Sequence, residues 1–185
     1  MVEIENLLKI ATEFHGERCP GIVLGTRMTI IGLRKLGLEP LTKNPGLVVY
    51  DEIDRCATDA IQAITGVSIG RRTLKHVNFG KFAATFVDTT RNTAVRVCLL
   101  PKWPHLPQDM IEFSQFVCNA SDEELFRVQD VRVSIQPEDL PGFPAKRSDC
   151  SRCGEEILDG KEVMIEGKSV CQNCAHHPYF SLITT

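Results

Sequence analysis

Four of the eight cysteines form two Cys-x2-Cys pairs near the end of the chain, Cys150 with Cys153 and Cys171 with Cys174. Seventeen residues separate the two pairs, a spacing typical of four-cysteine zinc sites. Zinc prefers tetrahedral thiolate ligation, and two such turns deliver four sulfurs. The sequence therefore predicts one zinc ion per chain, bound by all four cysteines.

This predicted zinc site has a closed ligand shell, because four protein sulfurs leave no coordination position for water or substrate. The pattern thus favours a structural role. A thioredoxin-like redox pair is the competing interpretation of one Cys-x2-Cys turn, but it leaves the second turn unexplained. His176 and His177 follow Cys174 directly. They could replace a cysteine as ligands, or they could be solvated surface residues.

A second group of chemically capable residues lies near the N-terminus. His15, Glu17 and Cys19 share one short loop before a predicted helix, and Cys56 follows a predicted strand at the start of another helix. The positive end of a helix dipole stabilises a thiolate, which predicts a lowered pKa for Cys19 and a similar setting for Cys56. These residues could form a metal or nucleophile site. Alternatively, both cysteines are small buried hydrophobic residues, and spacing alone does not decide.

The elements that would carry these residues can be outlined from the hydrophobic pattern. Helical periodicity covers about 7–14, and a second helix is expected from Pro20 to Leu36 with Gly37 as its C-cap. One side of that helix carries three glycines, which predicts close approach of another backbone. A helix at 56–64 and a short one begun by a Ser121–Glu124 capping box are also expected.

Strands are expected at 47–50, at 82–87 paired with 93–100 as a hairpin, and at 131–135. Interleaved helices and strands indicate an α+β fold, with a mixed sheet flanked by helices. Cys98 falls in a strand and Cys118 in an amphipathic helix, so both are expected to be core residues.

The zinc-binding segment is predicted to form a separate module. A proline-rich linker over 136–149 places a boundary near 140–148, which gives domains at 1–140 and 148–185. Between the cysteine pairs, segments 162–166 and 168–170 flank Gly167 as a hairpin, and Cys171 would open a short helix. These are the parts of a treble clef or a zinc ribbon. Such a small module needs its metal in order to fold.

Composition narrows the class of protein. The chain has 185 residues, a net charge of -3 and a pI near 6.0, which argues against nucleic-acid binding. The predicted zinc-binding module carries lysines and arginines, but the negative charges of its acidic residues cancel their positive charges. No secretory signal or membrane span is recognised. Eight cysteines without a signal indicate metal or thiol chemistry in a reducing cytoplasm.

Four motifs in register carry a family resemblance: His15-Gly-Glu-Arg-Cys-Pro-Gly21, Arg55-Cys-Ala-Thr-Asp-Ala-Ile-Gln62, Thr65-Gly66 and Phe79-Gly-Lys81. Together they resemble the FmdE family, which is named for formylmethanofuran dehydrogenase, over roughly residues 10–100. The resemblance implies an α+β core with a mixed sheet, a homodimer, and association with a molybdenum or tungsten enzyme of anaerobic one-carbon metabolism. The C-terminal zinc finger is an appendage that some members carry.

The resemblance also implies a site where the His-Gly-x-x-Cys-Pro loop meets Cys56. There a second metal could bind His15, Cys19 and Cys56. If the site is catalytic, one of the two cysteines is the thiolate, His15 is a ligand or base, and Lys81 is an electrostatic partner.

Three positions depart from the family pattern. Glu17 stands where a second histidine is common, Val67 where a cysteine is common, and Asn78 where an aspartate is usual. Glu17 could still ligate a metal or act as a general base. Because these changes remove candidate ligands without harming a fold, the alternative is a non-enzymatic accessory or chaperone for a metalloenzyme, with the finger binding the partner.

Overall fold

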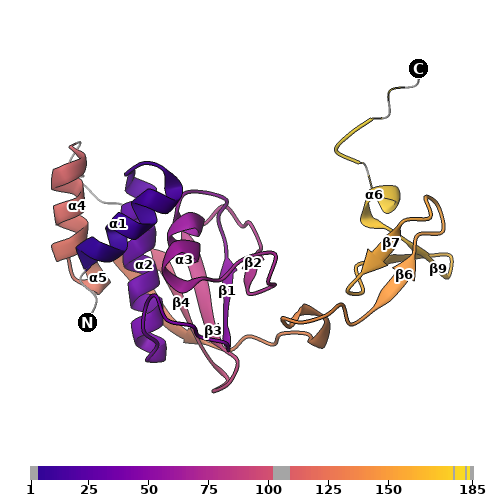
Figure 1. The fold of residues 1–185 in the computed structure, drawn as a ribbon, viewed down its shortest axis with the longest axis horizontal. Helices are drawn as coiled ribbons and strands as arrows, with labels where there is room; N and C mark the ends of the chain where they lie inside the picture. Colours follow the sequence, from indigo (N-terminus) through magenta and orange to yellow (C-terminus); the bar gives the residue numbers. More distant parts are fainter. Residues whose placement is uncertain (1–3, 102–108, 177, 182, 184–185) are drawn as a thin grey trace. The chain divides into compact units, whose positions relative to one another are not determined.

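The structure is a computed structural model that describes residues 4–101, 109–176, 178–181 and 183. It divides into two compact units, Met1–Ser134 and Ile135–Thr185 (Figure 1). The predicted proline-rich linker falls at the start of the second unit. Each unit is described by itself below.

Two long helices open the core unit. Helix α1 spans Ile4–His15 and buries Leu7, Leu8 and Ala11, the apolar face seen in the sequence. Helix α2 spans Pro20–Leu36, with Cys19 as its N-cap. Gly37 ends it in the left-handed conformation, as predicted.

The core contains one five-stranded sheet. Its strands are β1 (Leu47–Asp51), β2 (Leu74–His76), β3 (Ala83–Asp88), β4 (Thr93–Leu99) and β5 (Phe126–Val131). Their order is β2-β1-β3-β4-β5. Strands β1 and β2 are parallel, and every other neighbouring pair is antiparallel. The predicted mixed sheet and the β3–β4 hairpin are therefore confirmed. Helix α2 packs against β3 and β4, with α1 and α4 on its other side (Figure 1).

Helix α3 (Ala57–Thr65) forms the crossover between the parallel strands β1 and β2. A parallel pair requires such a connection, and the helix begins where β1 has just ended. The carboxyl ends of β1 and β2 therefore meet beside the N-terminus of α3. In α/β arrangements, ligands commonly bind in the crevice at this edge.

The prediction of a last strand at 131–135 was wrong, because β5 occupies Phe126–Val131. Two helices precede it, α4 (Met110–Asn119) and the four-residue α5 (Asp122–Leu125), which has the predicted capping box. Alternation of buried and exposed residues starts at Phe126, directly after α5. The chain thus enters the sheet five residues earlier than the valine pattern suggested.

The glycines of α2 allow close packing. A Cβ at Gly25 would lie 2.7 Å from the Cα of Ala57, so α2 and α3 approach backbone to backbone there, as predicted. At Gly32 the neighbour is instead the ring of Phe86, which an added Cβ would overlap. A Cβ added at Gly21 would lie 2.9 Å from the Cβ of Cys56, so Gly21 packs directly against that residue. The glycine face therefore places the start of α3 against the start of α2.

The second unit contains two small antiparallel hairpins and a short helix. The first hairpin pairs β6 (Arg147–Asp149) with β7 (Glu156–Leu158), and the second pairs β8 (Val163–Ile165) with β9 (Lys168–Val170). A 3-10 turn, η1 (Pro137–Asp139), precedes them, and helix α6 (Gln172–Ala175) follows. The second hairpin and the helix were predicted. The buried core comprises Cys150, Ile157 and Val170, too little apolar surface to hold the unit folded without a metal.

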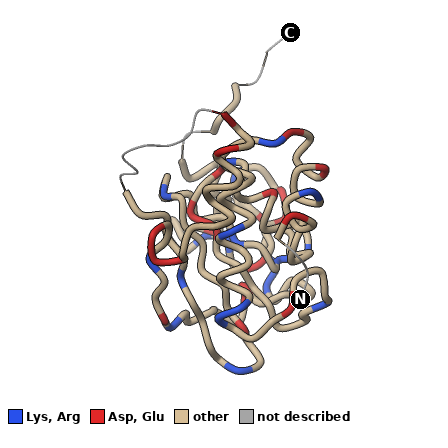
Figure 2. Tube along the Cα trace, turned by 90° about the vertical axis from the view of Figure 1, so that its left-hand side faces the viewer, with Lys and Arg blue, Asp and Glu red and all other residues tan. Residues whose placement is uncertain are grey.

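Charges are mixed along the described chain. Acidic and basic segments alternate along the trace in Figure 2, so no long stretch carries a single sign. Within the described residues, no helix combines the length and the apolar character that a membrane crossing requires.

Candidate functional site

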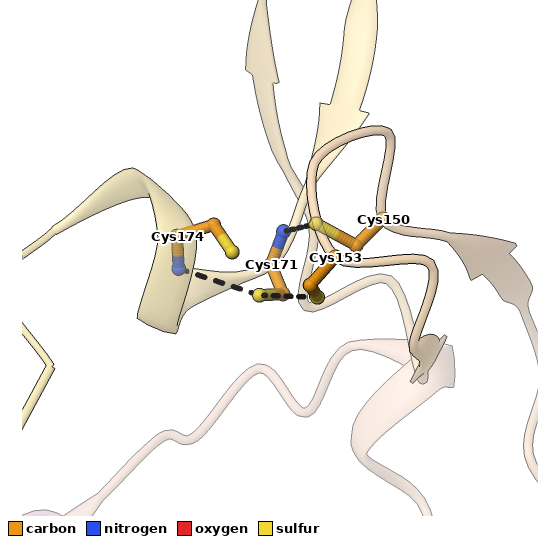
Figure 3. A group of neighbouring side chains, drawn as sticks. All are labelled: Cys150, Cys153, Cys171 and Cys174. Atoms are coloured by element: carbon orange, nitrogen blue, oxygen red, sulfur yellow. Dashed lines mark hydrogen bonds between the residues drawn. The ribbon is translucent and has the colours of Figure 1, made fainter. Parts of the chain in front are cut away.

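The four C-terminal cysteines converge in the second unit. Their sulfur atoms all lie within 4.8 Å of one another. Cys150 and Cys153 come from the turn between β6 and β7, whereas Cys171 caps α6 and Cys174 lies within it (Figure 3). This group could hold a metal ion such as zinc.

Backbone amides point at these sulfurs. The N–H groups of Cys171 and Arg152 donate to the Cys150 sulfur at 3.3 and 3.4 Å. Such bonds stabilise a thiolate, and those from Cys171 and Cys153 lower the pKa of Cys150 to about 6. The hydrogen bond with Cys171, together with the nearby sulfurs, raises the pKa of Cys174 to about 12. Without a cation, the four neighbouring thiols cannot all ionise, because their negative charges would repel one another. A divalent cation would neutralise that charge and allow all four to bind as thiolates.

The two histidines that follow Cys174 are candidate metal ligands from the sequence. His176 is exposed and does not belong to the four-cysteine group. His177 lies outside the described residues.

The N-terminal residues also converge. One ligand atom each from His15, Cys19 and Cys56 lies within 4.8 Å of the others. His15 is the last residue of α1, Cys19 caps α2, and Cys56 precedes α3. Gly16, with φ +100°, turns the chain between α1 and the loop. We call these three residues the core triad.

Asp59 orients the histidine of the core triad. The Nδ1 atom of His15 lies 2.7 Å from a carboxylate oxygen of Asp59. This bond leaves the Nε2 edge of the ring for ligation, and a carboxylate behind a ligating histidine is the usual arrangement at metal centres. The sequence interpretation missed Asp59. Its position three residues after Cys56 in a helix, and so on the same face, was the available signal.

The pKa of the Cys56 thiol is raised, whereas its position at a helix start predicted a lowered pKa. Burial, followed by the hydrogen bond and charge of Cys19, raises the pKa of the Cys56 thiol. The helix start was expected to favour a thiolate, but burial and, after it, the proximity of the Cys19 thiol outweigh that effect. A bound cation would reverse this effect by stabilising both sulfurs as thiolates.

A cavity of about 480 Å³ opens beside the core triad. Its lining residues come from α1, α3 and the segments around β1 and β2: His15, Asp54, Arg55, Cys56, Thr58, Asp59, Ile69 and His76. Cys19 does not line it. Neither does Lys81, whose ammonium lies 5.9 Å from the ring centroid of Phe79. The structure thus brings three of the four predicted core-site residues together and places Lys81 apart from the cavity lining.

The three family departures have distinct surroundings. Glu17 is exposed and is not within the core triad. Val67 is a buried core residue, 5% exposed. The side-chain amide of Asn78 donates to Asp54 at 3.1 Å, which ties the loop after β2 to the loop after β1.

A second histidine–carboxylate pair lies on the same cavity and was not predicted. Asp51, at the end of β1, is fully buried. It accepts the hydroxyl of Thr58 at 2.7 Å and lies 3.3 Å from Nδ1 of His76. His76 ends β2, a strand of three residues that is too short to recognise from sequence periodicity.

The buried carboxylate predicts a pH-dependent stability. Burial raises the pKa of Asp51 above its usual 3.8, although hydrogen bonds from Thr58, Ile53 and His76 oppose it. Between the unfolded and the folded pKa, the native state binds more protons, so the free energy of unfolding falls as pH rises through this window. In Asp51→Asn this fall should be absent.

The measurement is urea unfolding of both proteins with chelator present, in steps from about pH 3.5 to 6, a range that begins near the reference pKa of aspartate. The variant should gain stability relative to the parent as pH rises. A constant difference, or one of opposite sign, would contradict the raised pKa.

Comparison with known proteins identifies relatives of the whole chain. The family model described as "FmdE, Molybdenum formylmethanofuran dehydrogenase operon" matches residues 14–136. A protein of Archaeoglobus fulgidus named "Probable S-adenosyl-L-methionine-binding protein" is 30% identical over 212 aligned residues, covering 96% of this chain and 54% of that protein. The chain therefore spans about half the length of this curated relative.

A solved structure shares the fold. It is that of a "tungsten formylmethanofuran dehydrogenase subunit e (fmde)-like protein" from Syntrophus aciditrophicus, with a TM-score of 0.62 and 22% identity. The similarity covers 96% of this chain and 95% of that one. The family match includes His15, Cys19 and Cys56 and two thirds of the chain, and the family resemblance seen in the motifs is thereby confirmed: this chain belongs to the FmdE family.

Proposed function

We propose that the core unit is a zinc-dependent domain that binds a small molecule and acts in metabolism of the formylmethanofuran dehydrogenase type. The core triad would bind the zinc and the adjoining cavity would bind the ligand. The observation that carries this proposal is the convergence of two sulfurs and one imidazole within 4.8 Å of one another, beside a cavity of about 480 Å³ that His15 and Cys56 line.

The chemistry of the donor set fits zinc. Cysteine sulfur and histidine nitrogen are its preferred ligands, and Asp59 already holds the His15 ring with Nε2 free to ligate. Three protein ligands leave one position open, unlike the closed four-cysteine group. Zinc in such a site supplies Lewis acidity toward a bound water or carbonyl oxygen. The chain's own residues would orient the ligand and exclude water.

Metal analysis of the full chain tests the proposal. Purified under reducing conditions, the protein should contain two zinc ions per chain, one for each group. Cys19→Ser/Cys56→Ser should lose one of them and keep the finger folded. Cys98→Ser is the matched control, because this thiol contacts the carbonyl of Leu99 and belongs to neither group.

One zinc ion in the parent, unchanged in the Cys19→Ser/Cys56→Ser variant, would refute the core zinc site. It would favour the second candidate function, an accessory protein for a molybdenum or tungsten enzyme. The loss of two family ligand positions, to exposed Glu17 and buried Val67, supports that candidate. In either case we propose a cytoplasmic homodimer with a treble-clef-like finger at 148–185. We also propose Lys81 as an electrostatic partner of the ligand.

The name of the Archaeoglobus relative suggests a candidate ligand. That relative aligns with nearly all of this chain at 30% identity. S-adenosyl-L-methionine should therefore be titrated calorimetrically into the zinc-loaded protein. Binding that is lost in Arg55→Ala would place it in the cavity, since Arg55 lines it.

A further inference from the structure

The cavity beside the core triad carries two histidine–carboxylate pairs that occupy different settings. His15 pairs with Asp59 and belongs to the core triad. His76 pairs with Asp51 and does not belong to it, although both histidines line the same cavity. One cavity therefore contains one histidine that can bind a metal in the core triad and a second histidine that lies outside the triad.

The carboxylate behind His76 is fixed by its surroundings. Asp51 is 0% exposed, lies in the register of β1 opposite His76 of β2, and receives the Thr58 hydroxyl at 2.7 Å. Its backbone partner Ile53 donates to the other carboxylate oxygen at 3.4 Å. A buried acceptor held in this way fixes the orientation and the tautomer of the imidazole that contacts it.

The imidazole itself remains accessible. The side chain of His76 is 32% exposed and lines the cavity, while its Nδ1 atom lies 3.3 Å from Asp51. A proton on Nδ1 that bonds to Asp51 leaves Nε2, at the opposite edge of the ring, as a free proton acceptor. The other carboxylates of the cavity are already bonded, Asp59 to His15 and Asp54 to Asn78.

We propose that His76 is the proton-transfer residue of this cavity and that Asp51 is its positioning residue. The occupant would be a small molecule, or water, that offers an O–H or N–H group. Its proton would pass to Nε2 of His76, the ring would become an imidazolium stabilised by Asp51, and the same proton would later return. This assignment rests on the proposed function for the ligand, but the state of the ring can be measured independently.

Long-range proton–nitrogen NMR of the full zinc-loaded chain reads the tautomer directly. In the parent protein, neutral His76 should carry its proton on Nδ1. Asp51→Asn should shift the balance toward Nε2–H by about tenfold, the effect of losing a hydrogen bond to a charged group. Asp54→Asn is the matched control and should leave the tautomer unchanged.

Reaction with diethyl pyrocarbonate, mapped by mass spectrometry, gives a second readout because it requires a bare ring nitrogen. His76 should react in the parent and about tenfold more slowly in Asp51→Asn, while exposed His176 reacts equally in both. A proton on Nε2 in the parent, or equal reactivity in both proteins, would overturn the proposal.

Zinc content separates this inference from the proposed function. His76→Gln should keep both zinc ions, and loss of one would overturn the proposal by making His76 a metal ligand. Failure of the core zinc site would instead appear as a single zinc ion in the parent, whatever the tautomer of His76.

Discussion

Replacing both Cys150 and Cys153 with serine is expected to remove one zinc ion per chain and to unfold the second unit, while the core unit keeps its fold. The two cysteines supply half of the four sulfurs that lie within 4.8 Å of one another. Structural zinc in small fingers contributes about 10–16 kcal/mol of apparent binding free energy, which in such modules is also folding free energy.

The buried core of the second unit explains why nothing compensates for that loss. Only Ile157 and Val170 accompany Cys150 as buried apolar residues in the described part of this unit. The fold also depends on backbone bonds to sulfur, such as the one from the Cys171 amide to Cys150 at 3.3 Å. Serine retains an acceptor but binds zinc far less well than a thiolate.

Metal analysis and two-dimensional amide NMR would check this expectation. Amide signals from 147–175 should collapse into the unfolded range, whereas those from the core strands should stay where they are. Cys98→Ser controls for the loss of a thiol outside both groups. Dispersed finger signals in the double variant, or an unchanged zinc content, would disprove the assignment of the metal to these four cysteines.

The two clusters differ in how well sequence could predict them. The finger is local: two Cys-x2-Cys turns and one hairpin lie within 30 residues, so spacing alone specifies which atoms meet. The core triad joins α1, the α2 cap and the start of α3. Spacing left that meeting undecided, and it required the family motifs to suggest it.

The residues that sequence missed share a physical cause. His76 and Asp51 come together only because β1 and β2 are parallel neighbours, and β2 is a three-residue strand without a recognisable pattern. Asp59 lies within one helical turn of Cys56, but nothing in the sequence indicated that it would pair with His15. Lys81 is the opposite case, because a motif position suggested a role at the site and the residue is not among those that line the cavity.

Close packing between α2 and α3 positions the two sulfurs of the core triad, because Cys19 caps α2 and Cys56 directly precedes α3. Gly25→Ala should destabilise the core by about 1–3 kcal/mol, the usual cost of overpacking. The added Cβ would lie 2.7 Å from the Cα of Ala57 and 3.0 Å from the Cβ of Ala60. The first contact is with backbone, so no side-chain rotation can relieve it, and the gain in helix propensity of about 1 kcal/mol is smaller.

The same substitution should also weaken metal binding at the core triad. Separation of the two helices moves Cys56, which directly precedes Ala57, away from Cys19 at the start of α2. Competition with a zinc chelator would measure the affinity, and urea unfolding would measure the stability. The finger zinc should be retained, since the second unit contains none of these residues.

Gly32→Ala is the matched control for Gly25→Ala. Its added Cβ would overlap the ring of fully buried Phe86 rather than the α3 backbone. It should therefore destabilise the core without selectively weakening zinc binding, and Phe86→Leu should recover part of that loss in the double variant. If Gly25→Ala were as stable as the parent, or if both alanine variants lost core zinc equally, close approach of α2 and α3 would not be what positions the triad.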